Sequence, residues 1–375
     1  MPDVTLKKGG SKIVLKVNGL QFYSFNNFRL SLNYNSIAST FSFDGFFDIN
    51  NQQHKALFKP LQYQDCVLEI DGRRVLTGTI LNFNSSMEQV RGMAGISGYT
   101  KTGILEDVGI PPECYPLQND GLSLKQIAEK LCKPFGISVK VTGELYPQNV
   151  DSTPSRAELL ALTGNKENVQ IPTTSASESD SVKEYLTKLA KANNLILTHD
   201  AYGNLVITKL GTDKKPIATF TENKPSTMIS LSVNGQGMHS NIKMVGQSSR
   251  GTSVPVEGEV INPLVKKYRP ITKRQNTGDN TNTESAGEMA LGSELRNIYL
   301  TITTPDWYWT DGQKLYLILP NECISVHSPN NYMSRHTKWF VESVDIRGNS
   351  SETVATIKAV LPEVYTGKTP QYIFT

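Results

Sequence analysis

Both ends of this chain consist of short segments in which apolar and polar residues alternate, whereas the middle of the chain lacks this alternation. Residues 1–105 and about 226–362 carry this period of two, with polar turns between the segments and no sustained helical period. Such a pattern is typical of antiparallel barrels and sandwiches. The sequence therefore predicts an α+β, mainly β protein, with two tube-like antiparallel β-barrel domains that flank a small α+β insert.

The expected domain boundaries follow from where the pattern changes. Residues 1–105 form the first barrel domain, 106–225 the insert and 226–375 the second barrel domain. A length of 375 residues suits two to four domains, since a single core of that size is uncommon. Two similar barrels in one subunit would also let a trimer present six similar units around an axis.

One hairpin is marked especially clearly in the first region. Val67–Ile70 and Val75–Ile80 are strand-like segments separated by Asp71-Gly72. Asp-Gly readily takes the positive φ values that a two-residue turn needs. The sequence predicts an antiparallel hairpin here.

Two capping boxes predict the starts of two helices in the insert. Ser123 with Gln126, and Ser181 with Glu184, each place a hydroxyl three residues before a side chain that can reach back. An apolar helical face follows each pair. Residues 151–180 are rich in Ser, Thr, Asn and Glu and are expected to form an exposed loop with a short helix near 157–162.

Composition excludes several classes of protein. Charged residues make up 19 % of the chain, and 38 basic against 35 acidic residues leave a net charge of +3. This balance does not favour wholesale binding to nucleic acid or to an anionic membrane. No apolar run is long enough for a membrane helix, and the first residues lack the apolar segment of a secretory signal, so assembly in a cytoplasm is expected.

The sequence offers no recognisable catalytic or metal-binding motif. Its five histidines share no ligand spacing and are expected to be solvated, and no phosphate-binding glycine loop or nucleophile elbow occurs. The four cysteines are scattered and are expected to be reduced, part-buried residues. We therefore expect no enzyme activity, no cofactor and no metal.

Two clusters are candidate contact sites. The aromatic cluster Trp307, Tyr308 and Trp309 could stack on sugar rings or on a partner subunit, but its place between strands favours a role in closing one end of the second barrel. The basic run lies in a long polar connection, residues 247–282. It consists of Lys266, Lys267, Arg269, Lys273 and Arg274. It could contact nucleic acid or an acidic partner surface, or be a solvated loop.

Several short motifs, taken in order, resemble the Mu-like tail protein P family, the baseplate hubs of contractile phage tails (late control protein D-like). They are Phe58-Lys-Pro60, Gln64–Gly72, Val75–Gly78 and Gly98–Asp107. The likeness continues through Leu124–Ala128, Ile229–Val233, Val245-Gly-Gln247 and the helix-like segment 284–296. Tyr99-Thr-Lys-Thr102 departs from the family's usual Arg-Ser-Lys-Thr, and Thr79 stands where an aromatic residue is usual.

The resemblance implies a homotrimer in which six barrels form a ring with a central channel. One face of the ring would meet the hexameric tail tube and the other the trimeric spike, in contact with other baseplate proteins of the virion. Nucleic acid would be met only through the channel. The alternative function is a carbohydrate-binding or cell-wall-degrading tail component, motivated by the aromatic cluster and its acidic neighbours.

Overall fold

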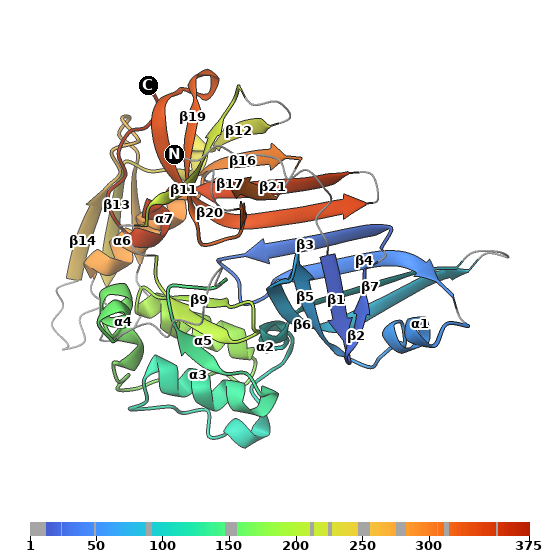
Figure 1. Ribbon diagram of the computed structural model, residues 1–375. Helices are drawn as coiled ribbons and strands as arrows, with labels where there is room; N and C mark the ends of the chain where they lie inside the picture. Colours follow the sequence, from blue (N-terminus) through green and yellow to red (C-terminus); the bar gives the residue numbers. More distant parts are fainter. Residues whose placement is uncertain are drawn as a thin grey trace.

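The computed structural model describes residues 13–23, 25–48, 50–87, 92–146, 156–210, 214–223, 227–246, 256–274, 283–305, 307–310, 315–349 and 352–375. Two β-rich regions lie side by side, and the helices of the middle of the chain pack below them (Figure 1). The mainly β, α+β class is confirmed.

The amino-terminal region contributes seven strands and one short helix. They are β1 (Ile13–Val17), β2 (Leu20–Phe22), β3 (Asn27–Asn33), β4 (Thr40–Phe47), α1 (Gln52–Leu57), β5 (Asp65–Ile70), β6 (Arg73–Met87) and β7 (Gly92–Thr100). The β5–β6 hairpin turns at Asp71 and Gly72, whose φ values are 49° and 78°. The hairpin predicted from Asp-Gly is confirmed.

The middle of the chain folds around its own apolar core. Its elements are α2 (Ile104–Asp107), α3 (Leu124–Cys132), β8 (Val139–Val141), α4 (Arg156–Thr163), α5 (Val182–Ala192), β9 (Ile196–His199) and β10 (Leu205–Thr208). Both predicted capping boxes are present, at the first turns of α3 and α5. The apolar faces of these helices pack together with Leu105, Leu205 and Ile207.

The segment expected to be an exposed loop is more ordered than its composition indicates. The short helix is present as α4, and Gln170 and Ser175 form β-bridges to Ser123 and Gln118. Backbone hydrogen bonds to the α3 entry supply the order that a polar sequence cannot obtain from its own apolar burial. Residues 147–155 lie outside the described part.

The carboxy-terminal region contributes the remaining elements. They are β11 (Pro216–Thr221), β12 (Met228–Val233), β13 (Asn241–Gly246), β14 (Val256–Ile261), β15 (Pro270–Arg274), α6 (Thr283–Leu295), β16 (Ile298–Thr304), β17 (Tyr308–Thr310), β18 (Leu315–Leu317), β19 (Cys323–Ser328), β20 (Met333–Asn349), β21 (Thr353–Val360) and α7 (Glu363–Thr366). The connection 247–282 is not wholly irregular, because β14 and β15 flank β13 in a separate three-stranded sheet.

The two β-rich regions share one sheet, which differs from the two separate closed barrels expected. β3 pairs antiparallel with β20, from Asn27↔Asn349 to Asn33↔Ser343, and this pairing joins the regions into a thirteen-stranded sheet. Within the described residues the strand path stays open. The free N–H and C=O groups of an edge strand readily pair with another strand, and β3 pairs with a strand 310 to 322 positions further along the same chain.

The two regions contain the same four-stranded unit. We define the amino block as β3, β4, β7 and β6 in sheet order, and the carboxy block as β12, β16, β21 and β20. Chain order matches sheet order in the same way in both blocks, and all neighbours are antiparallel. The fourth strand of each is long and carries a register shift, at Leu81 in β6 and at Glu342 in β20. The blocks are therefore topological repeats.

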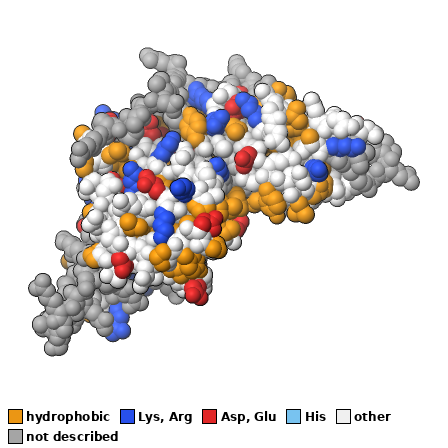
Figure 2. All heavy atoms as spheres, turned by 90° about the horizontal axis from the view of Figure 1, so that it is seen from below, with side chains coloured by type: hydrophobic (Ala, Val, Ile, Leu, Met, Phe, Trp, Pro, Cys, Tyr) orange, Lys and Arg blue, Asp and Glu red, His pale blue; other side chains and the backbone are white. Residues whose placement is uncertain are grey.

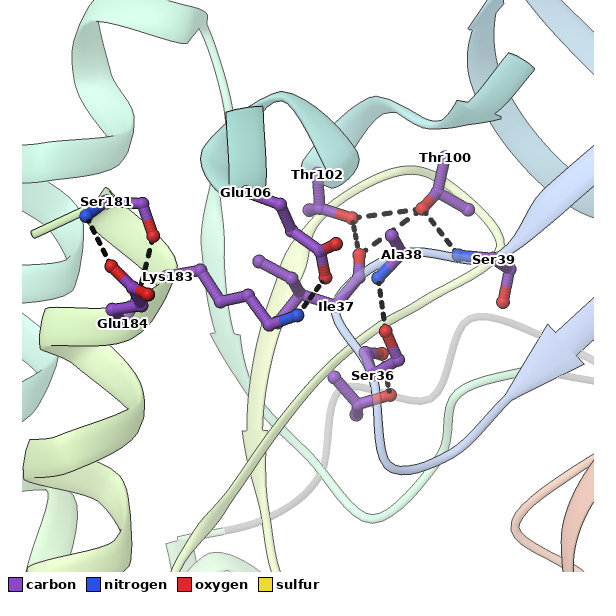
Figure 3. Close-up of polar contacts among 11 residues, drawn as sticks. Ser36, Ile37, Ala38, Ser39, Thr100, Thr102, Glu106, Ser181, Lys183 and Glu184 are labelled. Atoms are coloured by element: carbon purple, nitrogen blue, oxygen red, sulfur yellow. Dashed lines mark hydrogen bonds and ion pairs between the residues drawn. The ribbon is translucent and has the colours of Figure 1, made fainter. Parts of the chain in front are cut away.

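Polar contacts hold the β3–β4 connection against the end of β7, and an ion pair joins two helices of the insert (Figure 3). Thr102 Oγ1 donates to the Ile37 carbonyl at 2.5 Å, and Ser39 N donates to Thr100 Oγ1 at 3.1 Å. Lys183 of α5 forms an ion pair with Glu106 of α2. Thr198 Oγ1 of β9 donates to the Ser36 carbonyl at 3.3 Å, so the β3–β4 connection lies between the end of β7 and the insert and contacts both.

Candidate functional site

One face of the joined blocks is polar across every strand. Paired residues on neighbouring antiparallel strands point to the same side of a sheet, so the register defines rows. One row reads Met228, Thr303, Thr356, Asp345, Ser31, Thr40, Tyr99, Thr79 and Asp65. All nine are exposed or half-buried. We call this surface the polar face.

The opposite side of the same strands is buried. Leu30, Phe41, Ile302, Ile346 and Ile357 are each at most 2 % exposed and belong to one core that runs through both blocks. The alternation expected from the sequence is therefore continuous from β12 to β6. The continuous apolar layer fixes the strand register, because a shift of one residue would move the apolar side chains of a strand to the polar face.

The polar face is rich in hydroxyl and amide groups and carries acidic as well as basic side chains, among them Asp44, Asp345 and Arg347. Arg29 binds Asp345 at 2.6 Å, and Ser31 Oγ donates to the same carboxylate oxygen at 2.7 Å. The bond to Asp345 raises the pKa of Arg29. A shallow depression lies over Ser42, Ser97 and Tyr99 on this face.

Part of the aromatic cluster is buried. Trp307 and Tyr308 are 1 % and 2 % exposed. The Trp307 ring meets Phe28 edge-on at 5.6 Å, and Tyr308 Oη lies 2.6 Å from Asp71 Oδ2. These two side chains pack between the regions and are not presented to a sugar or a partner subunit. The side chain of Trp309 lies outside the described residues.

The basic run is largely engaged within the chain. Lys273 forms an ion pair with Glu294 at 2.9 Å, Arg269 donates to the Gln236 carbonyl at 3.1 Å, and Lys266 lies 4.9 Å from the Tyr372 ring centre. Lys267 and Arg274 are exposed, and Arg274 ends β15. The run is therefore split between a strand and the loop before it, which a sequence cannot show.

His199 is a buried residue that the sequence interpretation placed in solvent. Its Nε2 lies 2.7 Å from Ser39 Oγ and its Nδ1 lies 3.3 Å from the Asp200 carbonyl oxygen. Burial lowers its pKa to about 4, so the ring is neutral at pH 7. It serves as a joint between β9 of the insert and the β3–β4 connection.

A cleft of about 570 Å³ lies between the insert and the carboxy-terminal helices, lined by α5, β9, α6 and α7. Its lining contains no His, Cys or Asp. Two of its cations are already paired, Lys183 with Glu106 and Arg296 with Glu342.

Three absences concern the described residues alone. No His, Cys, Asp and Glu side chains of that part gather in threes to hold a metal ion. No helix within it is both long and apolar enough to cross a bilayer. On the face that Figure 2 shows, Lys and Arg side chains are interspersed with Asp and Glu, without one large area of a single sign.

Comparison with known proteins places this fold. The chain is 21 % identical to the baseplate hub protein gp44 of Escherichia phage Mu over 311 residues, which are 79 % of this chain and 74 % of that protein. This chain is therefore similar in sequence to a baseplate hub protein of a contractile phage tail, over about three quarters of both chains. No protein-family profile matches the sequence.

Solved structures share the fold over nearly the whole length. The 43 kDa tail protein of prophage MuSo2 from Shewanella oneidensis has a TM-score of 0.75 at 22 % identity, with 95 % of this chain and all of that chain covered. A tail protein from Neisseria meningitidis has a TM-score of 0.73 at 17 % identity, with 96 % and 99 % covered. The E. coli type VI secretion component c3393 has a TM-score of 0.54 at 13 % identity, with 96 % and 80 % covered.

Proposed function

We propose that this chain is the structural hub of a contractile phage or prophage tail baseplate. Three copies form a ring with sixfold pseudosymmetry and true threefold symmetry. The ring joins the hexameric tail tube to the trimeric spike, within a baseplate assembled in the host cytoplasm and carried by the virion. The similarity to gp44, a baseplate hub protein, supports this function.

The observation that carries the proposal is the repeated four-stranded block. Two topologically equal blocks per chain give a trimer six similar units around one axis. Six units match a sixfold partner, while the insert and the other unrepeated elements occur three times and match a threefold partner. The mechanism is geometric and needs no catalytic residue. We therefore propose a non-enzymatic role.

The polar face would line the channel of this ring. Its hydroxyl and amide groups, and its acidic side chains beside the basic ones, present no concentrated positive field. A strongly basic lining would hold a passing nucleic acid by many phosphate contacts. A nearly neutral polar lining instead suits a conduit through which a charged polymer moves without being retained.

The mass of the particle in solution tests this function. Light scattering on the purified full chain is expected to give three times the chain mass of 41.5 kDa. Negative-stain images should show a ring with a central hole. A monomer at every concentration tested would remove the proposal.

A further inference from the structure

Two strand edges at opposite ends of one sheet path have no strand partner within the described residues. The path is β12-β16-β21-β20-β3-β4-β7-β6, eight strands long. At one end β12 pairs only with β16. At the other end, residues Asn82–Met87 of β6 pair with β7 along one edge. Their other edge has no strand beside it, because the pairing of β5 with β6 ends at Thr79. Open edges of this kind are templates for another strand.

The register shows that the two open edges are equivalent to the two strands, β20 and β3, that already pair within the chain. The shifts at Leu81 and Glu342 equate Asn82 with Ser343. Following the cross-strand pairs through each block then equates Ser230 of β12 with Arg29 of β3. Within the chain, the fourth strand of the carboxy block, β20, pairs with the first strand of the amino block, β3. The fourth strand of the amino block and the first strand of the carboxy block are the two open edges.

Burial at equivalent positions shows what the open edge lacks. Leu32 of β3 is 0 % exposed beside β20, whereas Val233, its equivalent in β12, is 51 % exposed. On the fourth strands, Ile346 is 0 % exposed, whereas its equivalent Ser85 is exposed. Equivalent positions are thus buried where β3 pairs with β20 and exposed where β12 and β6 have no strand beside them.

We infer that β12 of one copy pairs antiparallel with β6 of the next copy, in the register of β3 with β20. Because Arg347 pairs with Arg29 in the chain, Ser86 of one copy would pair with Ser230 of the next. Asn84 then pairs with Ser232, and Phe83 with Val233. This inference rests on the proposed trimer and specifies how its copies join.

The inferred register keeps the two sides of the sheet consistent. Asn84 and Ser86 share a side with Ser97 and Met93 across β7, which is the polar face. Ser230 and Ser232 also lie on that face, opposite Thr301 and Tyr299. Phe83, Leu231 and Val233 lie together on the apolar side. A register displaced by one residue would bring polar and apolar sides together.

Neighbouring side chains define the length of this joint. Asn331 Nδ2 donates to the Ile229 carbonyl at 3.2 Å, which occupies the β12 edge at that residue and leaves Ser230–Val233 open. Beside the β6 edge lies the loop 59–64, in which Leu61 and Tyr63 are 75 % and 60 % exposed. These apolar side chains extend the contact area available to the next copy. Each copy offers one edge of each kind, as a head-to-tail ring requires.

Disulfide trapping between copies tests the joint. One preparation of the full chain carries Ser86→Cys and another carries Ser230→Cys. After mixing, subunit exchange and oxidation, covalent dimers that contain one chain of each kind are expected on a non-reducing gel. The matched control pairs Ser86→Cys with Leu231→Cys, whose side chain lies on the other side of the sheet, and should give at least about tenfold less dimer. The four native cysteines are buried and do not compete.

A charge on the β12 edge provides an independent readout. Val233→Lys is expected to raise the concentration at which the trimer dissociates by at least about tenfold, because a lysine on an edge opposes strand addition. Met228→Lys, at a residue 60 % exposed and beyond the Asn331 contact, is the control and should leave dissociation unchanged. Two results together would overturn the pairing of β12 with β6: trimers that show no selective disulfide between Ser86→Cys and Ser230→Cys, and trimers whose dissociation does not change with Val233→Lys. The proposed function would then still stand. A chain that is monomeric throughout would overturn both.

Discussion

Arg29 Nε and Nη2 both donate to Asp345 Oδ2, at 2.8 and 2.6 Å, although the two residues are 316 positions apart in the chain. Arg29 lies on β3 and Asp345 on β20, so this ion pair spans the seam where the two blocks meet. The ion pair joins β3 to β20 on the polar face, and the apolar core joins the same two strands on the other side of the sheet. The seam is thus specified by one charge-assisted contact and by a continuous apolar layer.

Removing the Arg29–Asp345 ion pair should weaken the seam only slightly. Arg29 is 65 % exposed in its side chain, and exposed ion pairs contribute about 0.2–1 kcal/mol. Arg29→Met and Asp345→Asn are each expected to lower the free energy of unfolding by that amount. A double-mutant cycle in urea measures the coupling, which should shrink in high salt. A coupling that salt leaves unchanged would contradict a solvent-screened pair.

Acid should destabilise the protein through His199. Its pKa is about 4 in the folded chain against 6.5 when unfolded, so the unfolded state binds the extra proton first. The stability that depends on the neutral ring is complete above pH 6.5 and is lost as the pH falls toward 4, by up to about 3 kcal/mol. Urea unfolding across this range measures the loss. His199→Gln should be less stable at pH 7 but show a flatter profile, and an equally steep profile would contradict this assignment.

Glu342 should contribute stability that disappears at lower pH. Burial by itself raises its pKa, but hydrogen bonds from Tyr365 at 2.5 Å and Lys358, together with Arg296, hold the pKa below its ordinary 4.5. The folded carboxylate therefore binds fewer protons than the unfolded one. Its contribution is present above pH 4.5 and is lost as the pH falls through the lower folded value.

Glu342→Gln tests that contribution directly. At pH 7 the substitution leaves the half-exposed Arg296 and Lys358 without their counter-charge and disturbs the hydrogen bond from Tyr365, and it should cost about 1–3 kcal/mol in unfolding free energy. The difference between the two proteins should narrow as the pH falls below 4.5 and the native carboxylate becomes protonated. Glu352→Gln, on an exposed residue, serves as the control and should change little at either pH. A difference that stays constant with pH would refute the charge-based account.

Gly98 should be intolerant of any side chain. A Cβ at this position would stand 2.0 Å from the Thr79 carbonyl oxygen and 2.8 Å from Phe41 Cζ, between β6 and β4. Gly98→Ala is expected to destabilise the chain by about 1–3 kcal/mol, as overpacking does. Gly109→Ala, where nothing lies within 4 Å, should change stability by less than about 0.5 kcal/mol. Equal effects in thermal or urea unfolding would contradict the close approach.

Local chemistry made much of this fold readable from the sequence. Asp71-Gly72 specified a hairpin because few residues tolerate two successive positive φ values. Ser123 and Ser181 specified helix starts because each satisfies backbone donors within three residues of itself. The alternation in both β-rich regions specified which side of each strand is buried. These features depend on neighbours in the chain, so the order of residues contains them.

Tertiary structure decided which distant segments meet. Every strand edge presents the same N–H and C=O groups, so nothing in β3 by itself selects β20 as its partner. The same holds for Trp307, whose aromatic character fits a partner surface as well as the interior contact with Phe28 that it makes. It also holds for His199, which enters the interior only because the insert folds back onto Ser39. Burial is a property of packed elements, and packing is settled only when all of them are in place.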